Sequence, residues 1–347
     1  MNMLRCLSGL ALVLAIVAPA RAAVYFAAHQ DDIVLLMGRN AQLDIRANRP
    51  TVLVVLTAGD AGNGNAAVAL AGLGGRYYNQ MGNPYYRVRH NAHEAALATW
   101  VPAAHSRIAQ RSVEYFGPAM SAVEKVRLGN VVLYNLNLPD GQLHRFGAGA
   151  GAGVPLTDVN GANRYLPATL YHTLRQIVAR HSKDSAAPVV HIPEHTPGFS
   201  TPGYNDFGQV ARYADHLDHT ATGRLVRAAL APNAALNCLR RVVYMGYAVS
   251  MLPEVMSGAE KASQVDAYSA LNTVLKNQGN VTFDANRRAM LLGSMDTFHT
   301  SFYGKQNTRE DTVSPECGLA ATPPMEVARH ARLQYQGGKS AARVQLR

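Results

Sequence analysis

Charged residues are scarce in this chain of 347 residues: Asp, Glu, Lys and Arg make up only 16% of it. The net charge is +10, but the basic residues are scattered, apart from a final tail with Lys339, Arg343 and Arg347. No segment interleaves basic and aromatic residues as nucleic-acid-binding helices do, so nucleic acid is not an expected partner. A basic surface remains compatible with an anionic glycan or lipid headgroup. Apolar residues make up 48%, enough for a sizeable core and too many for a disordered chain.

Long apolar runs are also missing, except near the N-terminus. Leu7 to Ala18 is apolar, but it is shorter than the roughly 20 residues that cross a bilayer. The run follows Arg5 and precedes Ala20-Arg21-Ala22, which has small residues where a signal peptidase needs them. We therefore expect residues 1–22 to be a signal peptide. The mature chain, beginning near Ala23, is expected to be periplasmic or secreted and to have no membrane span.

Cysteine is rare, with three in the chain. Cys6 would leave with the signal peptide, so Cys238 and Cys317 would remain. In an oxidising compartment these two thiols can form a disulfide, but the sequence does not show whether they come within bonding distance. The pairing stays open at this point.

The remaining sequence alternates strand-like and helix-like segments. Apolar, β-branched stretches predict strands at 23–28, 51–57, 131–138, 189–193 and 241–249. Helical spacing predicts helices at 33–47, 86–100, 166–181, 215–230, 259–276 and 287–295. This alternation predicts an α/β fold, a Rossmann-like three-layer sandwich with a mostly parallel sheet and helices on both faces. Residues 23–347 are expected to form one such domain, with a C-terminal extension from about 255.

The first chemically informative motif is His29-Gln30-Asp31-Asp32, directly after the first predicted strand. Side chains at the carboxyl end of such a strand point into the crevice where α/β proteins bind ligands. His29 and Asp32 can turn toward one divalent ion, while Asp31 can take a proton from a metal-bound water. In the alternative interpretation, Asp31 and Asp32 only cap the helix that begins near Ile33.

A second motif, His216-Leu217-Asp218-His219, has two imidazoles three residues apart, on one face of a helix if the helix has begun. Asp218 can fix the tautomer and orientation of one imidazole, and a histidine so held can stabilise an oxyanion or protonate a leaving amine. The alternative is a solvated first helical turn, capped by Asp215.

Together the two motifs resemble the PIG-L/LmbE-like family of zinc-dependent sugar N-deacetylases. That family has AHPDDE near its first strand and HPDH, followed by Ala/Thr-Gly, later in the chain. The resemblance extends over residues 24 to 250, and its segments occur in the same order as in the family. The further similar segments are Leu56 to Gly62 (LTAGDAG), the helix containing Arg89, Leu138-Pro139-Asp140-Gly141 and Tyr244-Met245-Gly246-Tyr247.

The resemblance implies a role for each matching residue. His29, Asp32 and His219 would bind zinc, and Asp31 would be the general base for the zinc-bound water. His216, oriented by Asp218, would stabilise the oxyanion or act as an acid. Arg89 would contact the substrate, although an arginine on a helix surface needs no such role.

This chain departs from the family pattern at three positions. Gln30 and Leu217 replace the prolines of the two motifs, and Ile33 replaces an acidic residue. None of these changes removes an implied ligand. Ile33 does remove a carboxylate near the site, which leaves the preferred metal and the substrate open.

The function predicted from these residues is metal-dependent amide hydrolysis, in which an N-acetyl group is removed from an N-acetylated sugar or glycoconjugate. One Zn²⁺ per chain is expected, and other divalent metals are compatible with the same ligands. A metallophosphoesterase with two metals about 3.5–4 Å apart is one alternative. A secreted carbohydrate-binding protein with a weakened site is another. A nucleotide-binding Rossmann enzyme is disfavoured, because the glycines at 59–64 do not complete the Gly-x-Gly-x-x-Gly pattern.

Overall fold

The computed structural model describes residues 21–59, 68–69, 76–79, 85–146, 154–182, 188–195, 215–281 and 299–311. Its main element is a sheet of eight strands in the order β13-β11-β10-β1-β2-β7-β6-β5. These strands span β1 Ala23–Ala27, β2 Thr51–Thr57, β5 Gln110–Phe116, β6 Ser121–Leu128, β7 Val131–Leu138, β10 Val189–Pro193, β11 Arg241–Tyr244 and β13 Thr308–Glu310. The five strands from β11 to β7 run parallel, and β5, β6 and β13 are antiparallel to their neighbours.

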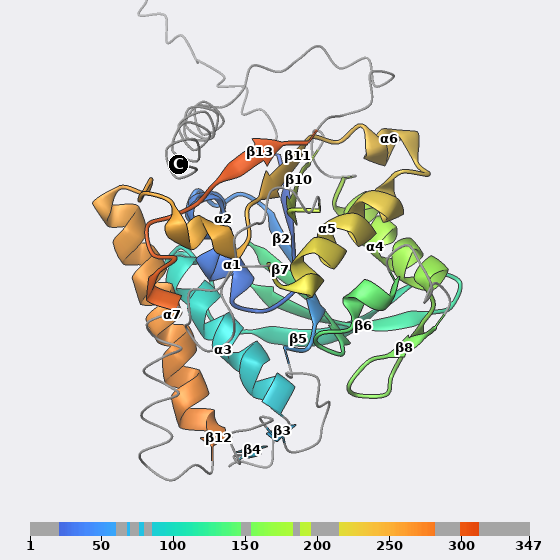
Figure 1. Ribbon diagram of the computed structural model, residues 1–347, viewed down its shortest axis with the longest axis horizontal. Helices are drawn as coiled ribbons and strands as arrows, with labels where there is room; N and C mark the ends of the chain where they lie inside the picture. The colour runs from blue at the N-terminus through green and yellow to red at the C-terminus, as the bar shows by residue number, and fades with distance from the viewer. Residues whose placement is uncertain are drawn as a thin grey trace, which may run out of the picture.

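Helices cover both faces of this sheet (Figure 1). One side carries α1 Asp32–Leu35, α2 Gly38–Arg46, α3 Tyr85–Trp100 and α7 Gly258–Gln278, and the other carries α4 Pro167–Ser182 and α5 Leu217–Leu230. The expected three-layer α/β fold with a mostly parallel sheet is therefore confirmed. Smaller elements are α6 Ala234–Asn237, the 3₁₀ turns η1 Leu143–Phe146 and η3 Tyr247–Met251, the pair β8 Leu156–Thr157 and β9 Arg164–Tyr165, and a sheet of β3 Val68–Ala69, β4 Arg76–Asn79 and β12 Gly279–Val281. Within the described part of the chain, no helix is long and apolar enough to cross a membrane.

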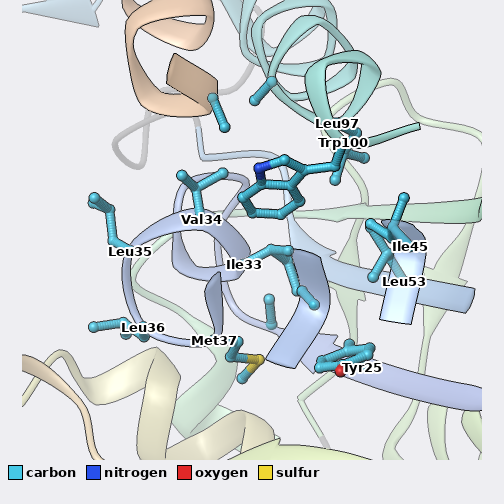
Figure 2. Close-up of a cluster of buried hydrophobic side chains, with 14 of the residues drawn as sticks. Tyr25, Ile33, Val34, Leu35, Leu36, Met37, Ile45, Leu53, Leu97 and Trp100 are labelled. Carbon is cyan, nitrogen blue, oxygen red and sulfur yellow. The ribbon is translucent and has the colours of Figure 1, made fainter. Parts of the chain in front are cut away.

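The central strand β1 is apolar throughout because both of its faces are buried. Successive side chains of a strand point to opposite faces. Tyr25 therefore lies in the core on the α1–α3 side, whereas Val24 and Phe26 lie in the core on the α4–α5 side. On the α1–α3 side, Trp100 of α3 packs beside Ile33 and Val34 of α1 (Figure 2).

The helix expected at 33–47 is divided in two, and the single-helix prediction is wrong. The backbone N–H groups of Leu36 and Met37 both donate to the Asp32 carbonyl, which ends α1 after Leu35. Gln264 of α7 then donates from its side chain to the Val34 carbonyl, at 2.9 Å. A carbonyl at a helix end needs such a partner. This partner lies 230 residues away in the sequence, so local spacing does not reveal the break.

Three other elements differ from the predictions. The antiparallel hairpin of β5 and β6 was not expected. The strand expected at 241–249 ends at Tyr244 and continues as the turn η3. The helix expected from 215 begins at Leu217, with His216 rather than Asp215 as its cap.

Some predictions concern residues that the structure does not describe. These are the helix expected at 287–295, residues 1–20 of the expected signal peptide, and Cys317. Cys238 is disulfide-bonded to a partner that also lies outside the described residues.

The loop after β7 is redirected by a bulge. The pairing with β2 moves from Val55 opposite Asn135 to Thr57 opposite Leu138, so β7 contains one extra residue there. Asn137, inside this bulge, has a φ of 58°. Asparagine is among the residues that accept this left-handed conformation most readily. Bulges next to active sites commonly redirect side chains, and this one immediately precedes the turn that contains Asp140.

Candidate active site

The two sequence motifs meet at the carboxyl edge of the parallel strands. The chain goes from β1 to β2 and β7 on one side, then returns to β10 and β11 on the other. Strand order reverses beside β1, and such a switch point opens a crevice for ligands in open α/β sheets. His29 and Asp32 follow β1, while His216 and His219 lie at the N-terminal end of α5. Residues 187 positions apart are therefore in contact, because His219 Nε2 lies 3.0 Å from Asp32 Oδ1.

His29, Asp32 and His219 form a compact, buried group. One ligand atom from each lies within 4.8 Å of the others, as a shared metal ion requires. His29 Nδ1 lies 3.5 Å from Asp32 Oδ2, so the Asp32 carboxylate faces a ring nitrogen of both histidines. Two imidazoles and one carboxylate are a ligand set typical of catalytic zinc, which keeps a fourth position for water or substrate.

The outer ring nitrogen of each histidine contacts an aspartate. His29 Nε2 lies 3.0 Å from Asp140 Oδ1, and His219 Nδ1 lies 2.8 Å from Asp215 Oδ1. In metal sites, such a carboxylate fixes the tautomer of the histidine and leaves its other nitrogen for the metal. The structure thus gives Asp215 the role that the sequence suggested for Asp218. The residues of this chain therefore fit a divalent metal.

Electrostatics in the group favour a bound cation. Burial lowers the pKa of His219, but Asp32 and Asp215 outweigh it and raise the pKa to about 10. The same balance, with Asp140 and Asp32, raises the pKa of His29. Burial alone would raise the pKa of Asp32, but the two imidazoles hold it well below its usual value. The carboxylates therefore stabilise positive charge at this position. Without a metal, protons on the two imidazoles supply that charge.

Asp31 points away from this group, toward Arg89 of α3. Arg89 Nη2 donates to Asp31 Oδ1 at 2.9 Å, and Arg89 Nε donates to Gln30 Oε1 at 3.2 Å. Burial opposes ionisation of Asp31, but Arg89, with His299 and His29, more than offsets it and lowers the pKa. Asp31 is thus ionised at neutral pH, as a general base must be. The contact between Arg89 and the substrate stays a prediction. In the structure, the Arg89 guanidinium binds the Asp31 carboxylate.

His216 lies beside His29, with ring centroids 4.6 Å apart. Its Nδ1 accepts a hydrogen bond from the backbone N–H of Asp218, at 3.3 Å. Burial, followed by the nearby His29 and His219, lowers the pKa of His216 to about 4. A neutral ring that accepts at Nδ1 carries its proton at Nε2, so His216 can donate a hydrogen bond from that atom.

The Asp218 carboxylate does not hold the ring of His216 as expected. It accepts from the backbone N–H groups of Gly141 and Leu143, at 2.6 and 3.0 Å. Asp218 therefore connects α5 to the loop after β7, and it places Asp140 beside His29. Asp218 does contact His216 as expected, but through its backbone N–H, which donates to His216 Nδ1, and not through its carboxylate.

Two of the departures from the family pattern have a structural explanation. Gln30 donates to the Thr57 carbonyl at 3.2 Å while it accepts from Arg89, so it helps hold the guanidinium beside Asp31. Ile33 is fully buried in the core against α3. Asp140 and Asp215 occupy the outer contacts of the two histidines, so the site keeps its surrounding carboxylates without an acid at position 33.

Asp140, Asp215 and His299 are site residues that the sequence reasoning missed. Asp140 stands in a turn after a predicted strand, and Asp215 directly precedes the second motif, so position offered a signal for both. His299 gave no such signal in the sequence, because it lies 80 residues beyond His219.

His191 lies in β10 but belongs to the core and not to this site. Its ring stacks on Tyr25 with centroids 3.9 Å apart, and burial lowers its pKa to about 3.

Gly246 lets Asp215 approach His219 closely. A Cβ atom at Gly246 would collide with the carboxylate of Asp215. The Gly246→Ala variant must therefore displace Asp215 from His219 Nδ1 and from the Tyr247 N–H, to which it bonds at 3.1 Å. We expect metal affinity to fall about 10- to 100-fold, the usual effect of losing a carboxylate behind a metal-binding histidine. A chelator-competition titration measures this change.

Gly258→Ala is the matched control, because a Cβ at Gly258 has no neighbour within 4 Å. Its metal affinity should equal that of the unchanged protein. Equal affinity in the Gly246→Ala variant would show that Asp215 does not support metal binding.

Comparisons with known proteins gave matches among solved structures only. No protein-family model matches the chain, and no curated protein matches its sequence. An N,N'-diacetylchitobiose deacetylase from Pyrococcus horikoshii is 13% identical, with 89% of each chain covered and a TM-score of 0.39. A deacetylase in the biosynthesis pathway of teicoplanin is 11% identical, with 85% of this chain and 99% of that chain covered and a TM-score of 0.43. The 4-carboxy-2-hydroxymuconate hydratase GalB from Pseudomonas putida KT2440 is 11% identical, with 88% and 99% covered and a TM-score of 0.41.

The matched structures include proteins described as deacetylases and one described as a hydratase. With identities of 11% to 16% among the matched structures, sequence identity does not assign a function to this chain. The function proposed below therefore rests on the side chains of the site.

Proposed function

We propose that this protein is a metal-dependent amide hydrolase that removes the N-acetyl group from an N-acetylated sugar or glycoconjugate, with zinc as the metal. The observation that carries the proposal is the arrangement of His29, Asp32 and His219. Each imidazole contacts an outer aspartate, and a separate carboxylate, Asp31, lies beside the group and accepts a hydrogen bond from Arg89. This combination of a metal-binding group and an adjacent ionised carboxylate is what hydrolysis by an activated water requires.

His29, Asp32 and His219 would hold the metal. A bound zinc ion lowers the pKa of a coordinated water toward neutrality and polarises a carbonyl oxygen. Asp31 accepts a proton from the attacking water, while Arg89 keeps its carboxylate oriented. His216 donates from Nε2 to the oxyanion that forms at the former carbonyl oxygen. The C–N bond then breaks, and the proton held by Asp31 passes to the departing nitrogen to give an amine and acetate.

The test is amine release from a panel of N-acetylated sugars. The purified protein is treated with a chelator, dialysed, and then reconstituted with zinc. We expect no release from the chelated protein and restored release with zinc. Retained activity after complete metal removal would reject a metal-dependent mechanism. Failure to bind zinc at all would reject the assignment of His29, Asp32 and His219 as ligands.

A metallophosphoesterase is the second candidate, and one observation favours it. His29 also belongs to a second group, with Asp140, His216 and Asp218, whose ligand atoms lie within 4.8 Å of one another. Two adjacent groups that share His29 could hold two metals, as many phosphoesterases do. Metal analysis separates the two candidates: one zinc per chain supports the deacetylase, whereas two ions with phosphate-ester cleavage support the alternative.

The N-terminal segment and the net charge bear on where the protein acts and on its substrate. We propose that the protein acts after export, because the apolar run that follows Arg5 has the features of a signal peptide. The net charge of +10 suits an anionic glycoconjugate. Binding of such a substrate should weaken with added salt, and salt-independent binding would contradict this electrostatic contribution.

A further inference from the structure

The C-terminal part of the chain reaches the base of the proposed reaction. α7 packs along α3, and β13 joins the main sheet, so residues 258–281 and 299–311 are built into the fold. His299 lies between these two elements in the sequence. Its Nε2 is 4.0 Å from Asp31 Oδ2, whereas Arg89 binds the other oxygen of the same carboxylate, Oδ1. Asp31 thus lies between a side chain from α3 and one from the C-terminal part.

Tyr268 of α7 anchors the ring of His299. The Tyr268 hydroxyl is hydrogen-bonded to His299 Nδ1, and the two rings also pack together, with centroids 5.2 Å apart. Tyr268 is buried, while the side chain of His299 keeps 12% of its surface exposed. Tyr268 therefore belongs to the core, and the ring that it holds is partly exposed.

The described contacts of His299 with Asp31 and Tyr268 favour one tautomer of its ring. A carboxylate only accepts hydrogen bonds, so the nitrogen that faces Asp31 is favoured as the N–H. In a neutral ring the other nitrogen, Nδ1, then accepts, and the Tyr268 hydroxyl donates to it. The separation of 4.0 Å from Asp31 is too long for a hydrogen bond. The Nε2–H dipole acts on the Asp31 carboxylate at this distance without binding it, which leaves Oδ2 able to accept a proton.

We propose that His299, anchored by Tyr268, is a positioning residue that together with Arg89 holds the Asp31 carboxylate in its reactive orientation. This inference rests on the proposed role of Asp31 as the general base. Arg89 binds Oδ1, and His299 faces Oδ2 from the other side, so the two side chains together restrict rotation of the carboxylate. A reacting group displaced by about 1 Å can lose about 100-fold in rate. His299 therefore acts on kcat through Asp31, and substrate affinity is not its target.

The kinetic test compares His299→Ala with His299→Gln. We expect kcat of the alanine variant to fall about 10- to 100-fold with KM and zinc content unchanged. Glutamine carries an amide N–H near the position of Nε2, so it should recover part of kcat. His105→Gln is the matched control, because His105 contacts Asn48 on the surface, and it should keep full activity. Unchanged kcat in the alanine variant, or a rise in KM alone, would overturn the inference.

A second measurement needs no substrate and separates this inference from the proposed function. Nitrogen NMR of the imidazole rings, recorded where His299 is neutral, reports its tautomer directly. We expect the Nε2–H form in the unchanged protein and a mixture of tautomers in the Asp31→Asn and Tyr268→Phe variants. An Nδ1–H form, or no response to Asp31→Asn, would overturn the placement of His299 even if the enzyme is active. If the sugar panel shows no activity while the tautomer responds as expected, the proposed function fails and the contact with Asp31 stands.

Discussion

Replacing Asp31 with asparagine should abolish most of the zinc-restored activity and leave zinc binding intact. Asparagine has nearly the same shape and can still accept the hydrogen bond from Arg89 Nη2, but it cannot take a proton. General acid–base catalysis contributes about 10²- to 10⁴-fold, so kcat should fall by that factor. The ligands His29, Asp32 and His219 are unchanged, so the zinc content per chain should equal that of the unchanged protein.

Steady-state kinetics and metal analysis on the same preparation check both parts of this prediction. Asp266→Asn makes the same chemical change at an exposed position of α7 and should keep full activity. Loss of zinc from the Asp31→Asn variant would indicate that Asp31 is a ligand. Activity within a factor of a few of the unchanged protein would show that another group is the base.

Metal binding should release protons and become much stronger as the pH rises. The pKa of His219 is raised to about 10 and that of His29 is also raised, so without metal both rings hold a proton at neutral pH. A metal binds only the neutral imidazole, so each ring must lose that proton. Two displaced protons make the apparent affinity rise about 100-fold per pH unit, as long as the pH stays below both raised pKa values. Acidification has the opposite sign and should strip the metal.

Calorimetric zinc titrations in buffers of different ionisation enthalpy count the released protons. We expect close to two protons per zinc in the unchanged protein. Asp215→Asn removes the carboxylate that contacts His219 Nδ1, so the pKa of His219 should fall and fewer protons should be released. A binding enthalpy that does not depend on the buffer would mean that both rings are already neutral.

Much of the site could be predicted because its residues form two short runs with clear positions. A strand buried on both faces is apolar throughout, so its end, and with it His29 and Asp32, could be located in the sequence. His216 and His219 were grouped by the three-residue spacing of one helical face. The structure brings all four together. It also places the predicted base, Asp31, beside these four residues, with one carboxylate oxygen bound by Arg89.

The surroundings of the site could not be predicted in the same way. Asp218 was expected to orient an imidazole, yet its carboxylate binds the backbone of Gly141 and Leu143. The aspartate that contacts His219 is Asp215, three residues before Asp218, which the sequence did not single out as the partner of that imidazole. Both carboxylates lie within one turn of the same imidazoles, so spacing could not distinguish them. The distinction depends on which way the loop after β7 approaches α5.

By itself, the sequence determined the alternation of buried strands and helices, the mostly parallel sheet, and the edge of that sheet where the two motifs would meet. These follow from local patterns, because burial on two faces and helical spacing leave their mark on consecutive residues. The tertiary structure alone decided which aspartates contact the histidines, where the first helix breaks, and that His299 reaches Asp31. Each of these depends on contacts between segments remote in the sequence, such as Gln264 with Val34, and no local pattern records them.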